Sequence, residues 1–170
     1  MNLFILRHGI ASDPGEDGLP KILADAERPL AARGKQRLWG VTRAMRKMDV
    51  TFDAVVSSPL LRARQTAQIV TEALELRRKL ILTNELAPDG SPKALIEQLN
   101  ELGPRAKDIL IVGHEPYLSQ LMALLVTGGT TAVMDLRKGG LAKLEIEKLR
   151  YARCATLAWL LTPKQMALMK

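Results

Sequence analysis

The stretch that most constrains the fold is NLFILRHG at residues 2–9. Its four consecutive apolar residues, 3–6, predict a short strand that is buried on both faces. Arg7 and His8 follow directly, and Gly9 allows the backbone to turn after them. In open α/β sheets the ligand crevice lies outside the carboxyl ends of the strands. An arginine suited to phosphate beside a histidine is typical of phosphoryl chemistry, although a turn with a surface cation explains this stretch equally well.

Apolar runs alternate with amphipathic helical patterns along the rest of the chain. Strands that alternate with helices predict a parallel-rich sheet. We therefore expect an α/β fold, a three-layer α/β/α sandwich with a mostly parallel central sheet, formed by one domain that spans residues 1–170. The expected strands are residues 3–6, 52–56, 80–82, 109–112, 141–146 and 153–161, and the expected helices are residues 31–48, 59–76, 92–102 and 116–126.

Two serine–proline pairs indicate where helices begin. Ser58 and Pro59 fit the N-cap and first position of the second helix, and Ser91 and Pro92 fit the same positions of the third. Arg62 then falls in the first turn of the second helix, near the positive end of the helix dipole. A cation there is unfavourable for the helix alone, and an anion bound at the same place relieves the conflict. A surface arginine that tolerates the position is the plainer alternative.

Composition narrows the classes of function. The net charge of +7 is compatible with an anionic substrate, and the clearest bias is in residues 137–170, with eight Lys or Arg against two Glu. With two Phe, two Tyr and two Trp, a base-stacking surface is poorly supported, so we expect no nucleic-acid partner. No apolar run is long enough to span a membrane and no signal peptide is visible, so we expect no membrane partner. The single cysteine, Cys154, fits a reducing, cytoplasmic location.

Three of the expected strands end in chemically active residues. The first strand delivers Arg7 and His8, the second delivers Ser58 and Arg62, and the strand at residues 109–112 delivers His114. Both histidines of the chain therefore lie at strand ends, and parallel strands place these ends at one edge of the sheet. Two imidazoles beside arginines, without nearby cysteine or paired carboxylates, make a poor metal site. We expect neither a metal nor a cofactor.

The same segments resemble a known family. LRHG at residues 6–9, SSPLLRARQTA at residues 57–67 and VGHEP at residues 112–116 are similar in sequence, order and spacing to the histidine phosphatase superfamily, which includes phosphoglycerate mutases. The resemblance covers nearly the whole chain. The short length, RPLAARGKQ at residues 28–36 and NELAPDG at residues 84–90 look most like the small SixA-type phosphohistidine phosphatases. The resemblance implies a phosphoglycerate mutase-like fold, and the short segment after residue 85 leaves no room for the lid insertion of larger relatives.

The resemblance also implies roles for the residues at the strand ends. His8 would be the nucleophile that becomes phosphorylated. The phosphoryl oxygens would be held by Arg7, Arg62 and a protonated His114. Such a set matches the chemistry, because phosphoryl transfer depends mainly on positioning and on neutralising the charge of three equatorial oxygens.

Three further residues are candidates for the site. Ser58 would contact the substrate, and so would Arg28, for which a structural role at the helix start fits equally well. Glu85 lies where larger relatives have the carboxylic acid that protonates the leaving group, although a loop carboxylate paired with a cation is an equal alternative. Phosphohistidine releases an imidazole, a better leaving group than an alkoxide, so a strong acid matters less for that substrate.

These observations predict an enzyme that removes phosphate from phosphohistidine on a signalling or carrier protein, through a phosphohistidine intermediate on the enzyme. An open pocket without a lid admits a phosphate that is carried on another protein. The first alternative is a phosphatase for small phosphate esters, with Glu85 as general acid. The second is a non-catalytic phosphoprotein- or RNA-binding module, which has no need of His8. A mutase is disfavoured because the chain is too short to enclose a substrate that must reorient.

Overall fold

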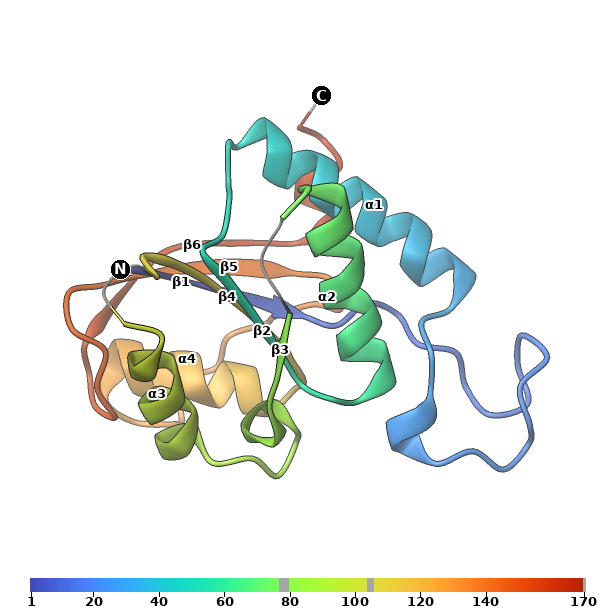
Figure 1. Ribbon diagram of the computed structural model, residues 1–170, viewed down its shortest axis with the longest axis horizontal. Helices are drawn as coiled ribbons and strands as arrows, with labels where there is room; N and C mark the ends of the chain where they lie inside the picture. Colours follow the sequence, from blue (N-terminus) through green and yellow to red (C-terminus); the bar gives the residue numbers. More distant parts are fainter. Residues whose placement is uncertain (77–79, 104–105, 170) are drawn as a thin grey trace.

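The computed structural model describes residues 1–76, 80–103 and 106–169. These residues form a six-stranded sheet with helices on both faces (Figure 1), so the expected α/β/α sandwich is confirmed. The strands are β1 (Asn2–Arg7), β2 (Ala54–Ser57), β3 (Ile81–Leu82), β4 (Asp108–Gly113), β5 (Leu141–Ile146) and β6 (Ala155–Leu161). The helices are α1 (Ala32–Lys47), α2 (Leu61–Ala73), α3 (Pro92–Glu101), α4 (Tyr117–Thr127) and α5 (Pro163–Met166), with two 3-10 turns, η1 (Asp25–Glu27) and η2 (Asn84–Leu86).

The sheet is mostly parallel, as the sequence predicts. Its strand order is β3-β2-β4-β1-β5-β6, and β3, β2, β4 and β1 run parallel to one another. β5 pairs antiparallel with β1, and β6 pairs antiparallel with β5 at the edge of the sheet. Because β4 lies between β1 and β2, the carboxyl ends of these three strands are neighbours.

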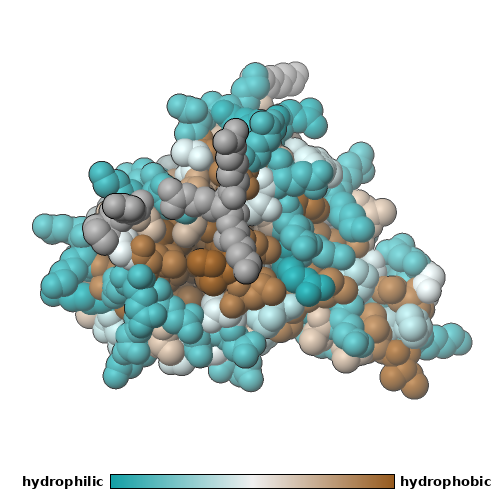
Figure 2. All heavy atoms as spheres, in the orientation of Figure 1, coloured by the Kyte–Doolittle hydropathy of each residue, from teal (hydrophilic) through white to brown (hydrophobic). Residues whose placement is uncertain are grey.

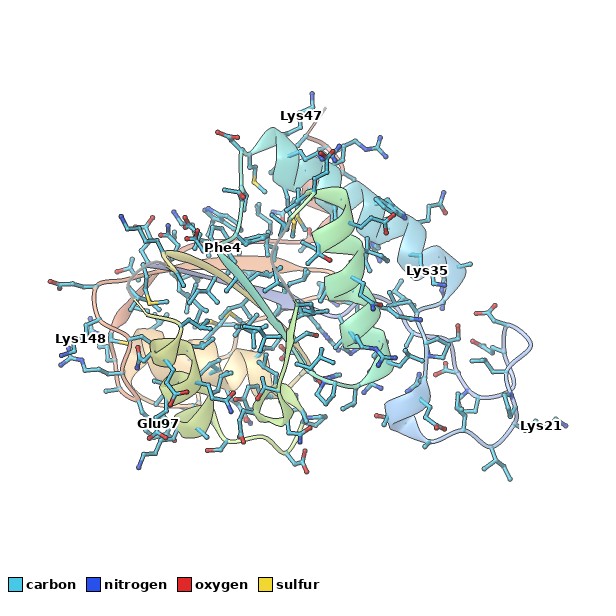
Figure 3. All side chains as sticks on the ribbon, viewed as in Figure 1. Phe4, Lys21, Lys35, Lys47, Glu97 and Lys148 are labelled. Carbon is cyan, nitrogen blue, oxygen red and sulfur yellow. The ribbon has the colours of Figure 1, made fainter. Side chains whose placement is uncertain are left out.

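The first strand contributes to a hydrophobic core on each side of the sheet. Leu3 and Ile5 pack in a core with residues of α3 and α4, whereas Phe4 and Leu6 pack in a core with residues of α1 and α2. Successive side chains of a strand point to opposite faces, so a strand that is covered on both faces must be apolar throughout. Figure 3 shows Phe4 in the middle of the sheet. The apolar run at residues 3–6 thus sets the layered fold.

Helix α2 begins later than the sequence predicts. Ser58 is not its N-cap, because the N-cap is Leu60 and the first helical residue is Leu61. The Ser58 hydroxyl instead forms a hydrogen bond with His114 at the strand ends.

The next two helices begin and end within one residue of the predicted positions, and α4 begins at Tyr117 instead of Pro116. The Ser91 side chain caps α3 and Pro92 is its first residue, as expected. Gly128 ends α4 in the left-handed conformation, with φ of 87°. Between Glu85 and β4, the described residues contain the end of η2 and the helix α3, so they hold no lid domain.

A long loop joins β1 to α1 and projects from the rest of the molecule (Figure 1). A bridge between Ala11 and Leu30 closes the base of this loop. Gly34 lets α1 approach the base closely, because a Cβ atom at Gly34 would lie 2.1 Å from the carbonyl oxygen of Ile10. The segment that follows β1 is therefore held against the first turn of α1.

On the face that Figure 2 shows, hydrophilic residues surround an apolar area that extends across the middle. An apolar group lies at the outer end of the loop between β1 and α1, where Ile22 is 92% exposed. Among the residues that the structure describes, no helix combines the length and the apolar character that a bilayer crossing requires.

Candidate active site

The carboxyl ends of β1, β2 and β4 meet, as the sequence predicts. Arg7 lies beside Gly113 in the pairing of β1 with β4, and Ser57 lies beside Val112 in the pairing of β2 with β4. The two outer strands are thus in register with the strand between them. The residues that follow directly lie at the same edge of the sheet: His8, Ser58 and His114.

His8 is buried and carries its proton on a defined nitrogen. Its Nδ1 atom lies 2.7 Å from the carbonyl oxygen of Gly9. A carbonyl oxygen only accepts hydrogen bonds, so Nδ1 bears the proton in the neutral ring and the lone pair is on Nε2. The Nε–H group of Arg62 points at this lone pair, with the two nitrogens 3.4 Å apart. The fold thus presents an oriented nucleophilic nitrogen beside a guanidinium group.

His114 faces His8 across the site. The ring centroids are 4.9 Å apart and the ring planes are inclined by 50°. His114 Nε2 and Ser58 Oγ form a hydrogen bond of 2.8 Å, whereas His114 Nδ1 is buried without a hydrogen-bond partner among the described residues. Buried polar atoms nearly always have a partner, so an unpaired one in a candidate site indicates a place for a ligand atom.

Arg62 is buried and bound to the loop between β1 and α1. Its Nη1 donates to the main-chain carbonyl oxygen of Asp25 at 2.6 Å, and its Nη2 donates to the Asp25 carboxylate at 2.8 Å. Because Arg62 lies in the first turn of α2, the Asp25 carboxylate places a negative charge of the protein itself at the helix end for which the sequence predicts a bound anion. Burial alone raises the pKa of Asp25, but hydrogen bonds from Arg62 and Arg28 hold it below its usual value.

Arg7 has fewer protein partners. Its Nη1 donates to the carbonyl oxygen of Leu136 at 2.9 Å, and its Nε is buried without a hydrogen-bond partner in the described part of the chain. Glu115 lies near enough to interact electrostatically with Arg7, and its Oε1 is also buried and unpaired. The other oxygen of Glu115 accepts a hydrogen bond from the Ser119 hydroxyl. Burial raises the pKa of the Glu115 carboxyl, and Ser119 and Arg7 offset part of this change.

Both imidazoles are neutral at pH 7. Burial lowers the pKa of His8 to about 3, against the hydrogen bond to Gly9 and together with the charges of His114, Arg62 and Arg7. Burial and the two arginines lower the pKa of His114 to about 4. In the protein alone, the neutral form of His114 is therefore favoured over the protonated form that the resemblance implies. A phosphoryl group beside the ring would raise this pKa, because an anion stabilises the charged form.

Hydrogen bonds hold the turn that carries His8. The Gly9 amide donates to Thr66 Oγ1 at 3.0 Å, and the Thr66 hydroxyl donates to the carbonyl oxygen of Arg62 at 2.7 Å. The amide of Gly139 lies 3.0 Å from the carbonyl oxygen of Arg7 and 3.2 Å from that of His8. The turn is thus tied to α2 on one side and to the segment before β5 on the other.

Glu85 lies in η2, and its carboxylate reaches the start of α3. Its Oε2 accepts a hydrogen bond of 2.7 Å from the amide of Ser91, the N-cap of that helix. Within the described residues it makes no hydrogen bond with either imidazole. The role of Glu85 as a general acid stays a prediction.

Arg28 is placed in the loop and reaches Arg62 through a shared partner. Its guanidinium donates to the loop at the Ser12 carbonyl oxygen, at Asp25 Oδ1 and at the Asp13 carboxylate. Asp25 also accepts a hydrogen bond from Arg62, so Arg28 is linked to Arg62 through Asp25. A contact between Arg28 and a substrate also stays a prediction.

The sequence does not identify two carboxylates of this region, Asp25 and Glu115. The loop carries five acidic residues and one lysine at positions 13–27, which is a visible signal, but nothing in their order selects Asp25. Glu115 follows His114 directly in the VGHEP segment, and this position next to a candidate site residue is the feature of the sequence that could have identified it.

Three comparisons agree with this geometry. Residues 3–87 match the model of the histidine phosphatase superfamily (branch 1). An uncharacterised protein of a Picosynechococcus strain is 36% identical over 146 residues, which cover 85% of this chain and 84% of that protein. The phosphohistidine phosphatase SixA of Escherichia coli is 29% identical over 133 residues, which cover 76% of this chain and 77% of that protein. A solved structure of the protein histidine phosphatase SixA complexed with tungstate has a TM-score of 0.81 at 26% identity and covers 96% of this chain and 98% of its own.

Proposed function

Because the chain belongs to the histidine phosphatase superfamily and is a phosphatase, we propose that it removes phosphate from phosphohistidine on a protein. The observation that carries the proposal is the lone pair of His8 Nε2, which lies beside the Nε–H group of Arg62 and across from His114. A neutral imidazole with its proton fixed on the other nitrogen is a competent nucleophile at pH 7.

In the first step, the lone pair of His8 Nε2 attacks phosphorus, and the P–N bond to the substrate imidazole breaks. The electron pair of that bond stays on the substrate nitrogen, and the substrate leaves as a neutral imidazole when its other ring nitrogen is protonated. The His8 proton remains on Nδ1 in the 2.7 Å hydrogen bond to the Gly9 carbonyl oxygen. The phosphorylated ring is therefore cationic, which offsets part of the phosphoryl charge.

In the second step, a water oxygen attacks phosphorus and the P–Nε2 bond breaks. Its electron pair returns to His8 Nε2, and a proton of the water passes to solvent. One water is consumed, inorganic phosphate is released, and the neutral ring is restored with its proton on Nδ1.

Positive groups from the three strand ends hold the phosphoryl oxygens in both steps. Arg7 contributes its unpaired Nε–H group. Arg62 has five N–H donors, of which three are directed at His8 and Asp25, so two remain for phosphoryl oxygens. His114 takes up a proton as the dianionic group approaches, because the nearby negative charge raises its pKa. Donors fixed before the reaction stabilise the charge that develops in the transition state.

Two observations support a phosphohistidine substrate over a phosphate ester. The E. coli relative is a phosphohistidine phosphatase, and the structure with a TM-score of 0.81 is a protein histidine phosphatase. Glu85, the predicted acid for an ester leaving group, has its carboxylate bound at the start of α3. An imidazole leaving group that carries its own proton does not need such an acid.

Phosphoryl trapping tests the nucleophile. The protein is mixed with a phosphotransfer domain that carries radiolabelled phosphohistidine, quenched within milliseconds and separated on a denaturing gel at alkaline pH. We expect an acid-labile label on the wild type, no label on His8→Ala, and a slower label on His114→Ala, which retains the nucleophile. A label of equal size on His8→Ala would contradict the mechanism.

Substrate preference is tested separately with Glu85→Gln. If phosphohistidine is the substrate, the variant keeps its turnover of the phosphotransfer domain, and the wild type hydrolyses that domain faster than p-nitrophenyl phosphate. A rate on the domain no higher than on the ester, with a large loss on the ester in Glu85→Gln, favours a phosphatase for small phosphate esters.

A further inference from the structure

A cleft lined by positive charge opens beside the candidate active site. Its volume is about 680 Å³, and six of its nine lining residues are cationic while none is acidic. Two of these cations come from the first turns of α1, two from the turn before β5 and one from α5, and the sixth ends β1. We call it the basic cleft; its cations are Arg7, Arg33, Arg37, Arg137, Lys138 and Lys164.

Most of this charge has no partner among the residues that the structure describes. Arg137 pairs with Asp135 at 2.7 Å, and Arg7 donates to a carbonyl oxygen. The other four cations form no ion pair or side-chain hydrogen bond within residues 1–76, 80–103 and 106–169, and all four are exposed. Like charges that converge on one cleft repel one another, so an anionic partner that binds there gains from all of them.

The basic cleft is continuous with the phosphoryl site through Arg7. Arg7 ends β1 directly before His8 and also lines the cleft. The loop that joins β1 to α1 carries five acidic residues and one lysine at positions 13–27, and its Asp25 binds Arg62. Its Glu16 and Asp17 line a separate hollow together with Arg33, so the negative charge of the loop borders the basic cleft.

We infer that the basic cleft is a docking surface for acidic side chains that lie to one side of the phosphohistidine on the protein substrate. The inference rests on the proposed function, because it names the surface of the same substrate. The acidic loop repels the same side chains, so they are expected to lie over the cations of the cleft and away from the loop.

The exposure of the cations favours a protein surface over the second phosphate of a small molecule. A compact phosphate is held best by converging, partly buried donors such as those of Arg7 and Arg62. The cations of the cleft instead lie on exposed side chains that come from α1, α5 and the turn before β5. Such a spread matches several carboxylates on a folded surface, and it accelerates encounter with an acidic partner.

The test compares two phosphohistidine peptides that differ only in charge. One peptide has several glutamates on one side of the phosphohistidine, and the other has glutamines at the same positions. For the wild type we expect kcat/KM to be about tenfold higher for the glutamate peptide at low salt, with the ratio falling as salt screens the charges. The ratio of the two peptides is the readout, so the absolute rate of each variant does not affect it.

Charge reversal on α1 tests the cleft itself. Arg33→Glu/Arg37→Glu is expected to lower the ratio to about one or below, and Lys138→Glu/Lys164→Glu, on other elements, is expected to do the same. The matched control is Lys47→Glu/Lys148→Glu, which changes the net charge equally. Figure 3 shows Lys47 at the end of α1 opposite to Lys35, and Lys148 on the side of the molecule opposite to the loop. Circular dichroism checks that each variant is folded.

The outcomes separate this inference from the proposed function. Equal turnover of the two peptides by the wild type, or an equal fall of the ratio in the control variant, overturns the docking surface and leaves the phosphatase activity intact.

If neither peptide is hydrolysed, the proposed function fails, and binding of the unphosphorylated, fluorescein-labelled peptides still tests the cleft. The docking surface is supported if the wild type binds the glutamate peptide several-fold more tightly than the glutamine peptide and if this difference is lost in Arg33→Glu/Arg37→Glu. Stronger competition by a short single-stranded RNA than by the glutamate peptide overturns it.

Discussion

The two arginines of the candidate site have opposite surroundings. Arg62 is 7% exposed, and Asp25 binds both of its Nη atoms. Arg7 is partly exposed, and its Nη1 donates to the carbonyl oxygen of Leu136. It also borders the other cations of the basic cleft. A carboxylate therefore hydrogen-bonds to Arg62, whereas Arg7 has only the electrostatic interaction with Glu115 and borders further positive charge.

The different surroundings of Arg62 and Arg7 indicate two ways in which a protein stabilises cations that lie close together. A buried, unpaired guanidinium is costly, so Arg62 needs the carboxylate that the loop supplies. Arg7 is partly exposed and keeps contact with solvent, so it needs no carboxylate within hydrogen-bond distance. Asp25 thus fixes Arg62 in the protein alone, and the proposed docking surface places the molecule that carries the phosphate on the Arg7 side.

The largest effect is expected from removing the two arginines one at a time. Arg62→Ala should lower kcat/KM on the phosphohistidine peptide by about 10³-fold, because Arg62 is buried beside the His8 lone pair. Arg7→Ala should lower it by only about 10²-fold, because neighbouring cations of the cleft replace part of its charge. Steady-state kinetics on both variants, with exposed Arg43→Ala as the control, measures the difference. An equal loss, or a larger loss in Arg7→Ala, would break the comparison.

The pH dependence of stability tests the two imidazoles that lie between the arginines. The unfolded histidines take up protons below about pH 6.5, whereas the folded pKa values are about 3 for His8 and about 4 for His114. Both pKa values are lowered, so the unfolded chain binds more protons in this window and the free energy of unfolding falls as the pH falls from about 6.5 toward 4. Each histidine contributes at most ~1.4 kcal/mol per pH unit.

Urea unfolding at a series of pH values between neutral and acid measures this slope. We expect a shallower slope in His8→Asn and in His114→Asn than in the wild type, with the wild-type slope flattening above about pH 6.5. If both variants kept the wild-type slope, the imidazoles would not be the groups that resist protonation. The pKa of His114 also reflects the comparison of the two arginines, because Arg62 and Arg7 both lower it while Asp25, the partner of Arg62, raises it.

The smallest effect is expected from neutralising the carboxylate beside Arg62. Asp25→Asn keeps an oxygen that can accept from Arg62 Nη2 but removes a negative charge next to the phosphoryl site. The affinity for tungstate should therefore rise by about threefold, a modest change because the Asp25 side chain is 60% exposed. Isothermal titration measures it, and Asp13→Asn is the matched control, since Asp13 binds Arg28 and not Arg62. Weaker tungstate binding in Asp25→Asn would mean that holding Arg62 in place outweighs the repulsion.

Local patterns were enough to predict where the site lies. The apolar runs at residues 3–6 and 109–112 are buried on both faces, which fixes them as central parallel strands and brings Arg7, His8 and His114 to one edge. The prediction of Ser58 as the N-cap of α2 was wrong, because the pattern of serine before proline cannot show that the hydroxyl has a closer partner in His114. Helix boundaries depend on such competition, and the competing partner lies 56 positions away.

The sequence by itself determined the layered fold and the residues that gather at the strand ends, because both follow from short-range periodicity and from the rule that parallel strands end together. Only the tertiary structure decided that Asp25 is the partner of Arg62, that the proton of His8 is on Nδ1, and that six cations from four separate segments line one cleft. Those features arise from contacts between distant parts of the chain, whose distances and burial set charge pairing and pKa values. No local pattern encodes them.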